Sequence, residues 1–298
     1  MPNVLVALLV LVPAFATGLG LTWLSGLRLG PEERLAVAAP LGALVLGLWG
    51  WVLGWLVGFH LTSLSLALLA SVGCSLPGWR RAGGGPALRA EAAEVWRRVS
   101  LPVRDPASLV PLALLLAVAW PLAVRILALA WVTTPDGGLA AGHLSTWSDG
   151  SAHLAYAGRF SGGGVVPIDS PIAAGEPARY HLLADFFAAQ VSLLGVSLPS
   201  ALAITSGFLA LAVPAVLYIC GVRVGGGRGA ARVGWVRFCV GGGLGVVALV
   251  RDVADLGWSA VVHLPREYSR DPAAGLWMDN PTLSYLYAQR NGLLGLPL

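Results

Sequence analysis

The chain contains no lysine and few charged residues of any kind. Charged side chains make up 11% of its 298 residues, whereas hydrophobic residues make up 56%. Soluble domains usually contain about 25% charged residues, so this composition excludes an ordinary soluble protein. The net charge of +4 comes from arginine alone, and we do not expect nucleic-acid binding. Without lysine, no glycine-rich run can form the GxxxxGK[ST] loop of a nucleotide hydrolase.

Cysteine is also scarce, and its spacing carries no metal motif. Cys74, Cys220 and Cys239 lie in or beside apolar segments and form no CxxC pair. This pattern speaks against a zinc site and against a disulfide framework. Residues 1–3 contain no Lys or Arg, so we expect the first apolar stretch to remain as a span rather than to be removed as a signal peptide.

Long apolar runs are abundant. A helix that crosses a bilayer needs about 20 mainly apolar residues. Six stretches meet this requirement, and they cover residues 3–25, 35–57, 61–78, 108–132, 199–222 and 233–250. We therefore expect an all-α, polytopic helical bundle of about six spans in a membrane.

Arginines collect in two connecting segments. The segment 79–107 holds six arginines, and the segment 223–232 holds three arginines and no acid. Because arginine is enriched in cytoplasmic loops, both segments are predicted to lie on the cytoplasmic side. Two large polar segments, 133–198 and 251–298, are then predicted to lie together on the outer side.

The segment 180–196 decides whether this map holds. For both arginine segments to lie on one side, the chain between them must cross the membrane an even number of times. The spans 108–132 and 199–222 already supply two crossings. We therefore expect 180–196 to form a helix lying in the outer interface, which suits its length and its mixture of aromatic and polar residues. The alternative is a seventh crossing, which would place the second arginine segment outside.

Three units follow from this map. Residues 1–79 are predicted to form a three-span accessory module, residues 80–107 a basic cytoplasmic loop, and residues 108–298 the main module with both outer segments. The last residues, NGLLGLPL, begin another apolar stretch without completing it. We therefore expect the chain to be a fragment truncated at its C-terminal side.

The polar segments carry motifs that resemble a known family. The motifs are WSDGSAH at 147–153, GRFSGGGVVPIDSPIAAGEPARYHLLADFF at 158–187 and MDNPTLSYLYAQRNGLLGLPL at 278–298. With an acid soon after a span and a second acidic outer segment, they resemble the membrane-embedded GT-C glycosyltransferases, in particular uncharacterised bacterial relatives of the protein mannosyltransferase and arabinose-transferase branch. The resemblance covers about residues 108–298. The tandem acids often seen in the family's first outer loop are a single Asp149 here.

The resemblance implies a reaction and its partners. Such enzymes move a sugar from a polyprenyl-phosphate donor to a glycan, lipid or protein acceptor at the outer face of the bacterial cytoplasmic membrane. Two other functions stay open. A transporter or flippase is expected to hold its polar residues at mid-membrane on broken helices. A non-catalytic membrane assembly protein would tolerate the loss of Asp149.

Asp149 is the candidate catalytic base. A carboxylate near the membrane surface can take the proton of the acceptor hydroxyl as the bond between sugar and phosphate breaks. The alternative is an N-cap, because Ser148, Asp149 and Gly150 are typical of a helix start. His153 follows by four residues, so on a helix it shares a face with Asp149 and can orient that carboxylate or contact the phosphate. A surface role is the alternative for His153.

Three arginines are candidates to bind the leaving phosphate. Arg159 and Arg179 lie in the first outer segment, where a guanidinium can bind phosphate through two hydrogen bonds. Anchoring in lipid headgroups is the alternative for both. Arg125 lies inside the span 108–132, where a charge usually faces a cavity or pathway. Its alternative is snorkelling to the outer end of the span.

Five more residues are candidates for substrate binding. Tyr180 precedes His181 and Asp185, which share a helix face if their segment is helical. The alternative is the polar edge of an interfacial helix. Asp252 and Asp255 follow the last span, where the resemblance places a second acidic motif.

This second acidic motif leaves the use of a metal open. One of its acids can assist the base, or bind a divalent cation together with Asp149. Acids that simply end a span in water are the alternative, so the cofactor stays unknown from sequence.

Overall fold

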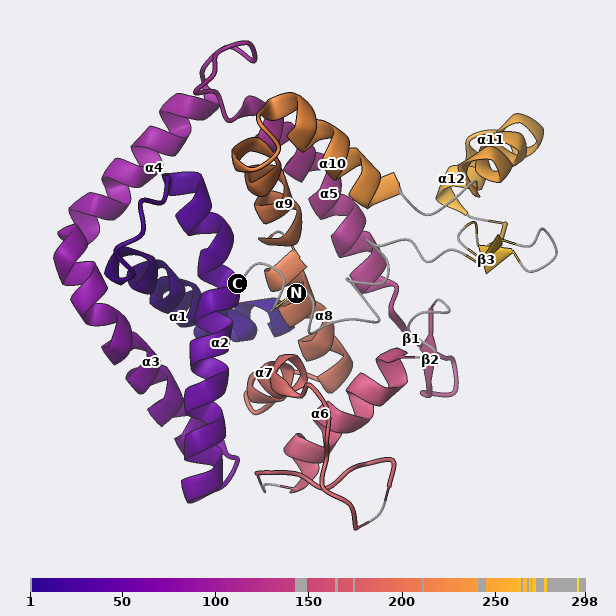
Figure 1. Cartoon of the computed structure of the whole chain (residues 1–298). Coiled ribbons are helices and arrows are strands. Elements are labelled where there is room, and N and C mark those ends of the chain that lie inside the picture. The colour runs from indigo at the N-terminus through magenta and orange to yellow at the C-terminus, as the bar shows by residue number, and fades with distance from the viewer. Residues whose placement is uncertain are drawn as a thin grey trace.

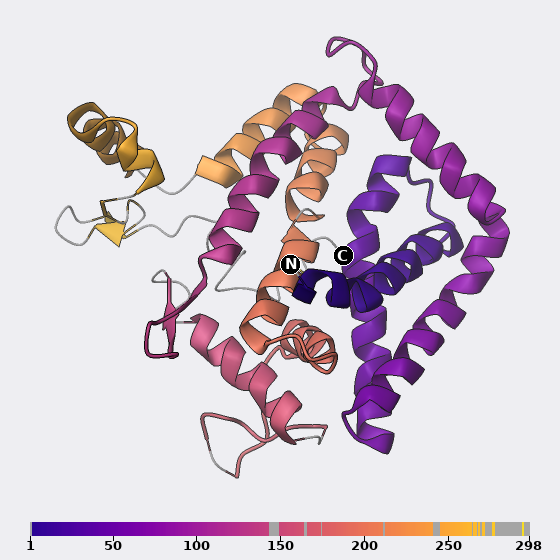
Figure 2. The ribbon, with the colours of Figure 1, turned by 180° about the vertical axis from the view of Figure 1, so that it is seen from behind.

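The computed structural model describes residues 2–142, 149–163, 166–173, 175–210, 212–240, 245–263, 265–266, 268, 270–271, 276–277 and 294. The chain is mostly helical, as predicted, with two short antiparallel strand pairs in addition. Figures 1 and 2 show the arrangement from opposite sides.

The helices and strands follow the chain in this order. The first helices are α1 (Pro2–Leu24), α2 (Pro31–Val57), α3 (Leu61–Ala82), α4 (Gly85–Val99) and α5 (Val110–Ala128). The strands β1 (Trp131–Thr133) and β2 (Leu139–Ala141) pair with each other. The later helices are α6 (Ser151–Gly163), α7 (Leu183–Ser192), α8 (Leu198–Ala210), α9 (Ala212–Arg223), α10 (Arg228–Val240), α11 (Gly245–Leu256) and α12 (Ser259–Val262). The strands β3 (Arg270–Asp271) and β4 (Leu276–Trp277) form the second pair.

The first two helices pack at unusually close range. A side-chain carbon added to Gly18 of α1 would lie 1.9 Å from the carbonyl oxygen of Ala38 in α2. One added to Gly42 of α2 would lie 1.7 Å from the carbonyl oxygen of Ala14 in α1. Such contact between backbones requires glycine, and small residues at helix crossings are typical of bundles in lipid, where no hydrophobic effect drives helices together.

One hydrophobic core joins the N-terminal helices to the later ones. Val10 of α1 and Leu46 of α2 are fully buried in the same cluster as Phe187 of α7 and Leu209 of α8. The predicted accessory module 1–79 therefore shares its core with the rest of the bundle, and its separate role stays a prediction. In Figure 1, α2 lies between α3 on one side and α7 with α9 on the other.

Both arginine-rich segments meet at one end of the bundle, which we call the basic end (α4, residues 100–109 and residues 223–228). The guanidinium of Arg228 donates to the carbonyl oxygens of Asp105 and Ser108, each at 2.6 Å. At the start of α2, Arg98 pairs with Glu32 at 2.6 Å. The structure thus brings together the two segments predicted to share a side, whereas the side of the membrane stays a prediction.

Two devices fix the start of α2 at this end. Pro31 occupies the first turn, where its missing N–H leaves no bond unmade, and the backbone N–H of Gly30 donates to the carboxylate of Glu33 at 2.6 Å. Two acids in the first turn also suit the positive end of the helix dipole. From this start α2 runs 27 residues, or about 40 Å at 1.5 Å per residue.

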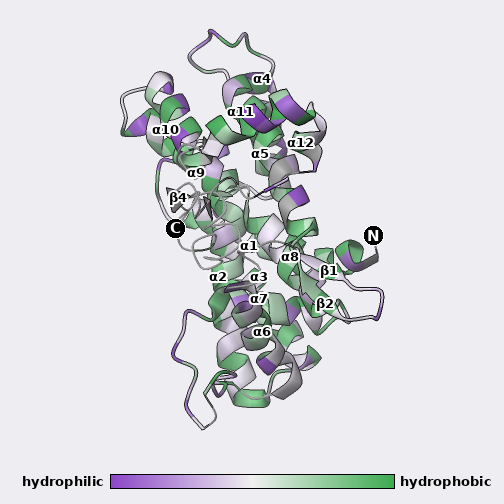
Figure 3. Ribbon diagram, turned by 90° about the vertical axis from the view of Figure 1, so that its right-hand side faces the viewer, coloured by the Kyte–Doolittle hydropathy of each residue, from purple (hydrophilic) through white to green (hydrophobic). Residues whose placement is uncertain are grey.

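The opposite end, which we call the α6 end, consists of α6, the loop 166–182 and the connector 58–60. Phe59 of this connector is buried in one cluster with Phe160 of α6 and Phe186 of α7. Figure 1 shows α6 and its loop at the bottom of the view and the loop after α4 at the top. The hydropathy colours in Figure 3 place hydrophilic residues on α4, α10 and α11 and in the connecting loops.

Four helical stretches are long and apolar enough to cross a membrane: Asn3–Leu24, Pro31–Val57, Leu61–Ala82 and Leu198–Arg223. They indicate a membrane protein and match four of the predicted spans. The predicted span 108–132 appears as α5, which ends at Ala128, and its apolar part is shorter than the other four. After the helix, β1 and β2 form a hairpin whose turn has Gly137 at φ +82°.

The predicted span 233–250 has no single helix in the described residues. Helix α10 begins at Arg228, inside the predicted connector 223–232, and ends at Val240. A second helix, α11, begins at Gly245, and residues 241–244 between them lie outside the described residues. The prediction of six spans is therefore supported for four of them.

The predicted interfacial helix 180–196 was wrong in two respects. Helix α7 contains only ten residues, and its eight residues from Ala184 to Val191 are all buried. A helix lying at a lipid surface would expose one apolar face. Instead α2, α6 and α8 pack around α7, so protein rather than lipid covers it.

Candidate functional site

An aromatic cluster holds α6 and α7 side by side against the second half of α2. The rings of Phe160 in α6 and Phe186 in α7 have centroids 4.9 Å apart, and both rings contact Trp51 of α2. Phe59 adds two further ring contacts. Each such aromatic pair contributes about 0.5–1.5 kcal/mol beyond its buried area. The cluster therefore fixes where polar side chains on the two helices meet.

A helical stripe carries His153 into the interior. The buried residues of α6 are His153, Tyr156, Ala157 and Phe160, which follow the spacing i, i+3, i+4, i+7 of one helix face. Three of them suit a buried face, and His153 is the polar exception at 1% exposure. A buried imidazole needs hydrogen-bond partners from a neighbouring element.

Asp185 of α7 is that partner. Its carboxylate oxygen lies 2.8 Å from Nδ1 of His153, and Asp185 itself is 0% exposed. When Nδ1–H donates to the carboxylate, the tautomer is fixed and Nε2 becomes the acceptor of the ring. The pair therefore holds the imidazole in one orientation inside an apolar surrounding.

Tyr180 covers this pair toward the surface. Its ring stacks on the buried Tyr156 with centroids 5.1 Å apart and an interplanar angle of 3°, and lies 5.9 Å from the His153 ring. Tyr180 is 42% exposed. Partial burial raises the pKa of the Tyr180 phenol, and the nearby charges of Asp185 and Asp149 and the phenol of Tyr156 raise it further. Asp149 and Asp185 therefore both lie close to one accessible phenol.

Asp149 lies directly before α6 and is half-buried. It is four residues from His153, but the described hydrogen bond of His153 goes to Asp185 rather than to Asp149. The neighbouring residues 143–148, which include Trp147 and Ser148 of the WSDGSAH motif, lie outside the described residues. Among the site's carboxylates Asp149 is the accessible one, because Asp185 is enclosed.

The prediction that His181 and Asp185 share a helix face was wrong. His181 lies in the loop before α7 and is exposed, whereas Asp185 is on α7 and buried. Because α7 begins only at Leu183, the two residues do not share a helix face. His181 does lie beside Tyr180, with ring centroids 5.8 Å apart.

The three candidate arginines have different surroundings. Arg159 on α6 pairs with Asp169 of the following loop at 3.6 Å, and both side chains are exposed. Arg179 is exposed directly before Tyr180. Arg125 is exposed on α5, and it does not belong to the cavity lining given below. Arg159 and Arg179 thus belong to the α6 end, whereas Arg125 lies on α5.

Asp252 and Asp255 lie far from this site. Figures 1 and 2 show α11 and α12 standing apart from α6 and α7. Asp252 accepts hydrogen bonds from Arg266 at 2.7 Å and from the Tyr268 hydroxyl at 2.6 Å, and these two donors lower its pKa. The prediction that Asp252 or Asp255 assists Asp149 is therefore not supported by their placement.

No metal site is visible where the chain is described. Within those residues, no group of three or more His, Cys, Asp and Glu side chains is arranged to hold a metal ion. The segment 278–298, with the third motif of the family resemblance, lies almost wholly outside the described residues.

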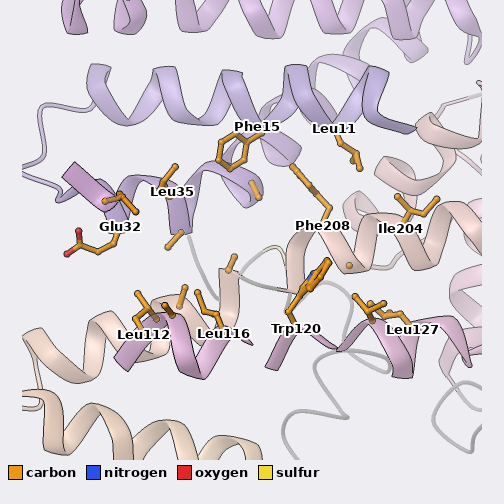
Figure 4. A pocket seen from close by; sticks show the side chains of 18 of the residues that line it. Leu11, Phe15, Glu32, Leu35, Leu112, Leu116, Trp120, Leu127, Ile204 and Phe208 are labelled. Carbon is orange, nitrogen blue, oxygen red and sulfur yellow. The ribbon is translucent and has the colours of Figure 1, made fainter. Parts of the chain in front are cut away.

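A large apolar cavity is lined in part by Ala203, Ile204, Gly207 and Phe208 of α8. Its volume is about 880 Å³, and α1, α2, α5, α8 and α9 supply most of its lining. Figure 4 shows Glu32 at one end, Phe208 and Trp120 near the middle, and Leu127 and Ile204 toward the other end. Glu32 is the one charged residue of this lining. Such a space suits an aliphatic chain rather than a polar ligand.

The sequence alone did not reveal the central pair. His153 and Asp185 are 32 residues apart, so no local spacing links them. The one available signal was that His153 is in phase with the apolar residues Tyr156, Ala157 and Phe160.

Comparisons with protein-family models, with curated proteins and with solved structures find no match to the chain. The resemblance to GT-C glycosyltransferases stays a prediction.

Proposed function

We propose that this chain is a membrane glycosyltransferase that moves a sugar from a polyprenyl-phosphate donor to an acceptor hydroxyl. The observation that supports this most is the buried hydrogen bond between His153 and Asp185, which lies beside the accessible Asp149. Charged and titratable side chains are rarely enclosed in an apolar bundle without a function. A carboxylate at the mouth of such a pair is suited to take a proton.

Asp149 acts as the general base in this proposal. The acceptor oxygen forms a bond to the anomeric carbon of the sugar, and its hydroxyl proton passes to the Asp149 carboxylate. The bond between the anomeric carbon and the phosphate oxygen breaks, and its electron pair leaves with the polyprenyl phosphate. Asp149 serves better than His153 because it is half-buried, whereas His153 is 1% exposed.

The His153–Asp185 pair positions the start of α6. By holding the imidazole rigidly one turn after Asp149, it limits the motion of the segment that carries the base. Removing a residue that holds a functional side chain in place typically lowers activity about 10–100-fold, as measured for residues that hydrogen-bond to metal ligands. Asp185 is therefore a positioning residue in this proposal and does not touch substrate.

Arg179 and Arg159 are the proposed phosphate ligands. Arg179 is exposed beside Tyr180, and the pair between Arg159 and Asp169 is long at 3.6 Å and solvent-exposed. A phosphate can compete for such a guanidinium, because two parallel hydrogen bonds to one anion are stronger than a single exposed ion pair. Tyr180 offers its exposed ring beside the same place.

The cavity is the proposed place of the polyprenyl tail. Its lining is almost wholly apolar. The end of the cavity with Leu127 and Ile204 lies toward the C-terminal end of α5, after which the polar segment 133–198 begins. The arginine-rich basic end supports an orientation with that end in the cytoplasm and the α6 end outside. The reaction would then occur at the outer face of a bacterial cytoplasmic membrane, with an envelope glycan, lipid or protein as acceptor.

The test is sugar transfer by the purified full chain in liposomes. A panel of polyprenyl-phosphate donors with radiolabelled hexoses or pentoses is offered with crude envelope acceptors, and release of polyprenyl phosphate is measured. We expect release from at least one donor in the presence of acceptor. No release from any donor would contradict the proposal, and movement of intact donor across the bilayer would favour a flippase.

A further inference from the structure

Helix α4 is fixed to the bundle through one of its faces. Glu91 accepts a hydrogen bond from Arg34 of α2 at 2.7 Å, and Arg98 pairs with Glu32 at 2.6 Å. All four side chains are largely covered, between 18% and 19% exposed. On the same face, Val95 packs against the cluster around α5 and α9. This face therefore serves the fold, and it orients the rest of α4 outward.

The outward face combines arginine with an exposed tryptophan. Arg89 and Trp96 are seven residues apart and so lie on one side of the helix, and Trp96 is 75% exposed. Arg80 and Arg81 at the end of α3 are exposed as well. In the part of the chain that the structure describes, no carboxylate pairs with Arg80, Arg81 or Arg89.

The position of α4 in the chain places this face at a membrane surface. The candidate span α3 ends at Ala82, and α4 begins at Gly85. Five charged residues lie among its 15, which is too many for the hydrocarbon layer. The segment 79–107 holds six arginines and three acids, so its net charge is +3. A helix tethered to a span in this way stays beside the headgroups.

We propose that the outward face of α4, with Arg80, Arg81, Arg89 and Trp96, binds anionic phospholipid headgroups. Guanidinium groups bind phosphate through charge-assisted hydrogen bonds. Tryptophan is enriched where the headgroups meet the hydrocarbon. Surface arginines are attracted to anionic lipid, and the attraction adds up over several of them. This proposal does not depend on the proposed glycosyl transfer.

Lipid bound here would also brace the cavity. Val95 and Val99 of α4 line it together with Glu32, which Figure 4 shows at one end. The ion pair between Glu32 and Arg98 closes the same end. Anionic lipid that holds α4 in place therefore stabilises one end of the cavity.

Binding is tested with the full chain purified in a neutral detergent. Retention of phosphatidylglycerol is compared with that of phosphatidylcholine by native mass spectrometry. We expect tighter binding of phosphatidylglycerol, and a loss of about fivefold in affinity for each of the substitutions Arg80→Gln, Arg81→Gln and Arg89→Gln. Arg251→Gln, an exposed arginine on α11, is the matched control and should leave the affinity unchanged.

The wild type gives a second readout that does not depend on how the variants fold. Salt screens charge, so rising salt should weaken the retention of phosphatidylglycerol while that of phosphatidylcholine stays constant. Inorganic phosphate at equal ionic strength should not displace the lipid. Equal affinity for both lipids, or variants that bind phosphatidylglycerol like the wild type, would overturn the proposal and leave this face to a protein partner or to solvent.

Discussion

The two ends of the bundle both gather charged side chains, but they hold them in different ways. At the basic end, carboxylates pair with arginines and keep partial contact with water, as Glu91 does with Arg34 and Glu32 with Arg98. At the α6 end, the carboxylate of Asp185 is fully buried and pairs with an imidazole. Arginine stays protonated and cannot exchange a proton near neutral pH, whereas histidine can. The comparison teaches that one end is suited to tie helices together and the other to position groups for proton transfer.

The largest expected effect belongs to Asp149. Asp149→Asn keeps the shape of the side chain and removes the base, so transfer should fall about 10²–10⁴-fold, the usual cost of losing a general base. The matched control is Glu176→Gln, an exposed carboxylate of the same segment, which should leave the rate unchanged. Initial rates with radiolabelled donor measure both, and equal rates in the two variants would remove Asp149 from the mechanism.

Next comes the buried pair itself. Asp185→Ala removes the carboxylate that accepts from the buried imidazole of His153 and should lower the free energy of unfolding by about 1.5–3 kcal/mol, the usual contribution of a hydrogen bond to a charged group. Glu91→Ala at the basic end should cost only about 1 kcal/mol, because water reaches Arg34. Denaturation in detergent compares the two variants. Similar losses in the free energy of unfolding would mean that the ion pair at the basic end contributes as much to stability as the buried pair at the α6 end.

Asp185→Asn separates positioning from folding. The amide keeps the volume of the carboxylate but weakens its hold on the Nδ1 tautomer of His153, so transfer should fall about 10–100-fold with the fold retained. The drop should appear in kcat while KM for the donor stays constant, since Asp185 does not touch substrate. Glu91→Gln is the control at the other end and should leave both constants unchanged.

A smaller effect is expected in the cavity. Ala203→Phe places a ring where the polyprenyl tail is proposed to lie, so KM for a long-chain donor should rise about tenfold or more. A water-soluble donor with a short chain should be transferred with an unchanged KM. Val236→Phe on the exposed face of α10 serves as the control. Equal shifts for both donors would place the tail elsewhere.

The smallest effect is a change in one pKa. The Tyr180 pKa lies above its ordinary value of 10.0 through burial and the charges of Asp185 and Asp149. Because the pKa of Tyr180 is higher in the folded state than in the unfolded state, the protonated phenol favours folding. This stabilisation is present below the ordinary tyrosine pKa of about 10 and is lost as pH rises through the folded value. Asp149→Asn removes one negative neighbour, so the pKa should fall. NMR titration of the tyrosines, with the Tyr180 signal assigned from Tyr180→Phe, measures this pKa. An unchanged pKa in Asp149→Asn would mean that the Asp149 carboxylate does not act on the Tyr180 phenol.

Sequence reasoning succeeded where the fold depends on local composition. The need for about 20 apolar residues to cross lipid is local, and it predicted α1, α2, α3 and the stretch from α8 to α9. It failed where packing decides. Helix α7 looked interfacial from its aromatic and polar residues, but α2, α6 and α8 cover it. The close contact of Gly18 with α2 also depends on how two helices cross.

The candidate site divides in the same way. Asp149, His153, Tyr180 and Asp185 were each singled out from their residue types, and the structure brings them together. Their pairing was not predictable, because His153 meets a carboxylate 32 residues away rather than its neighbour in the sequence. Asp252 was placed by the order of segments along the chain, and order carries no information on the distance between α11 and α6.

The most direct measurement locates the donor on one of the two ends. A photoreactive polyprenyl-phosphate sugar analogue is cross-linked to the full chain in liposomes, with natural donor as competitor, and the adducts are mapped by mass spectrometry. If the α6 end binds the substrate, competed adducts should lie within residues 149–181, near Asp149 and Tyr180. Competed adducts on α4 or residues 223–228, where arginines alone could hold the phosphate, would contradict the proposed site.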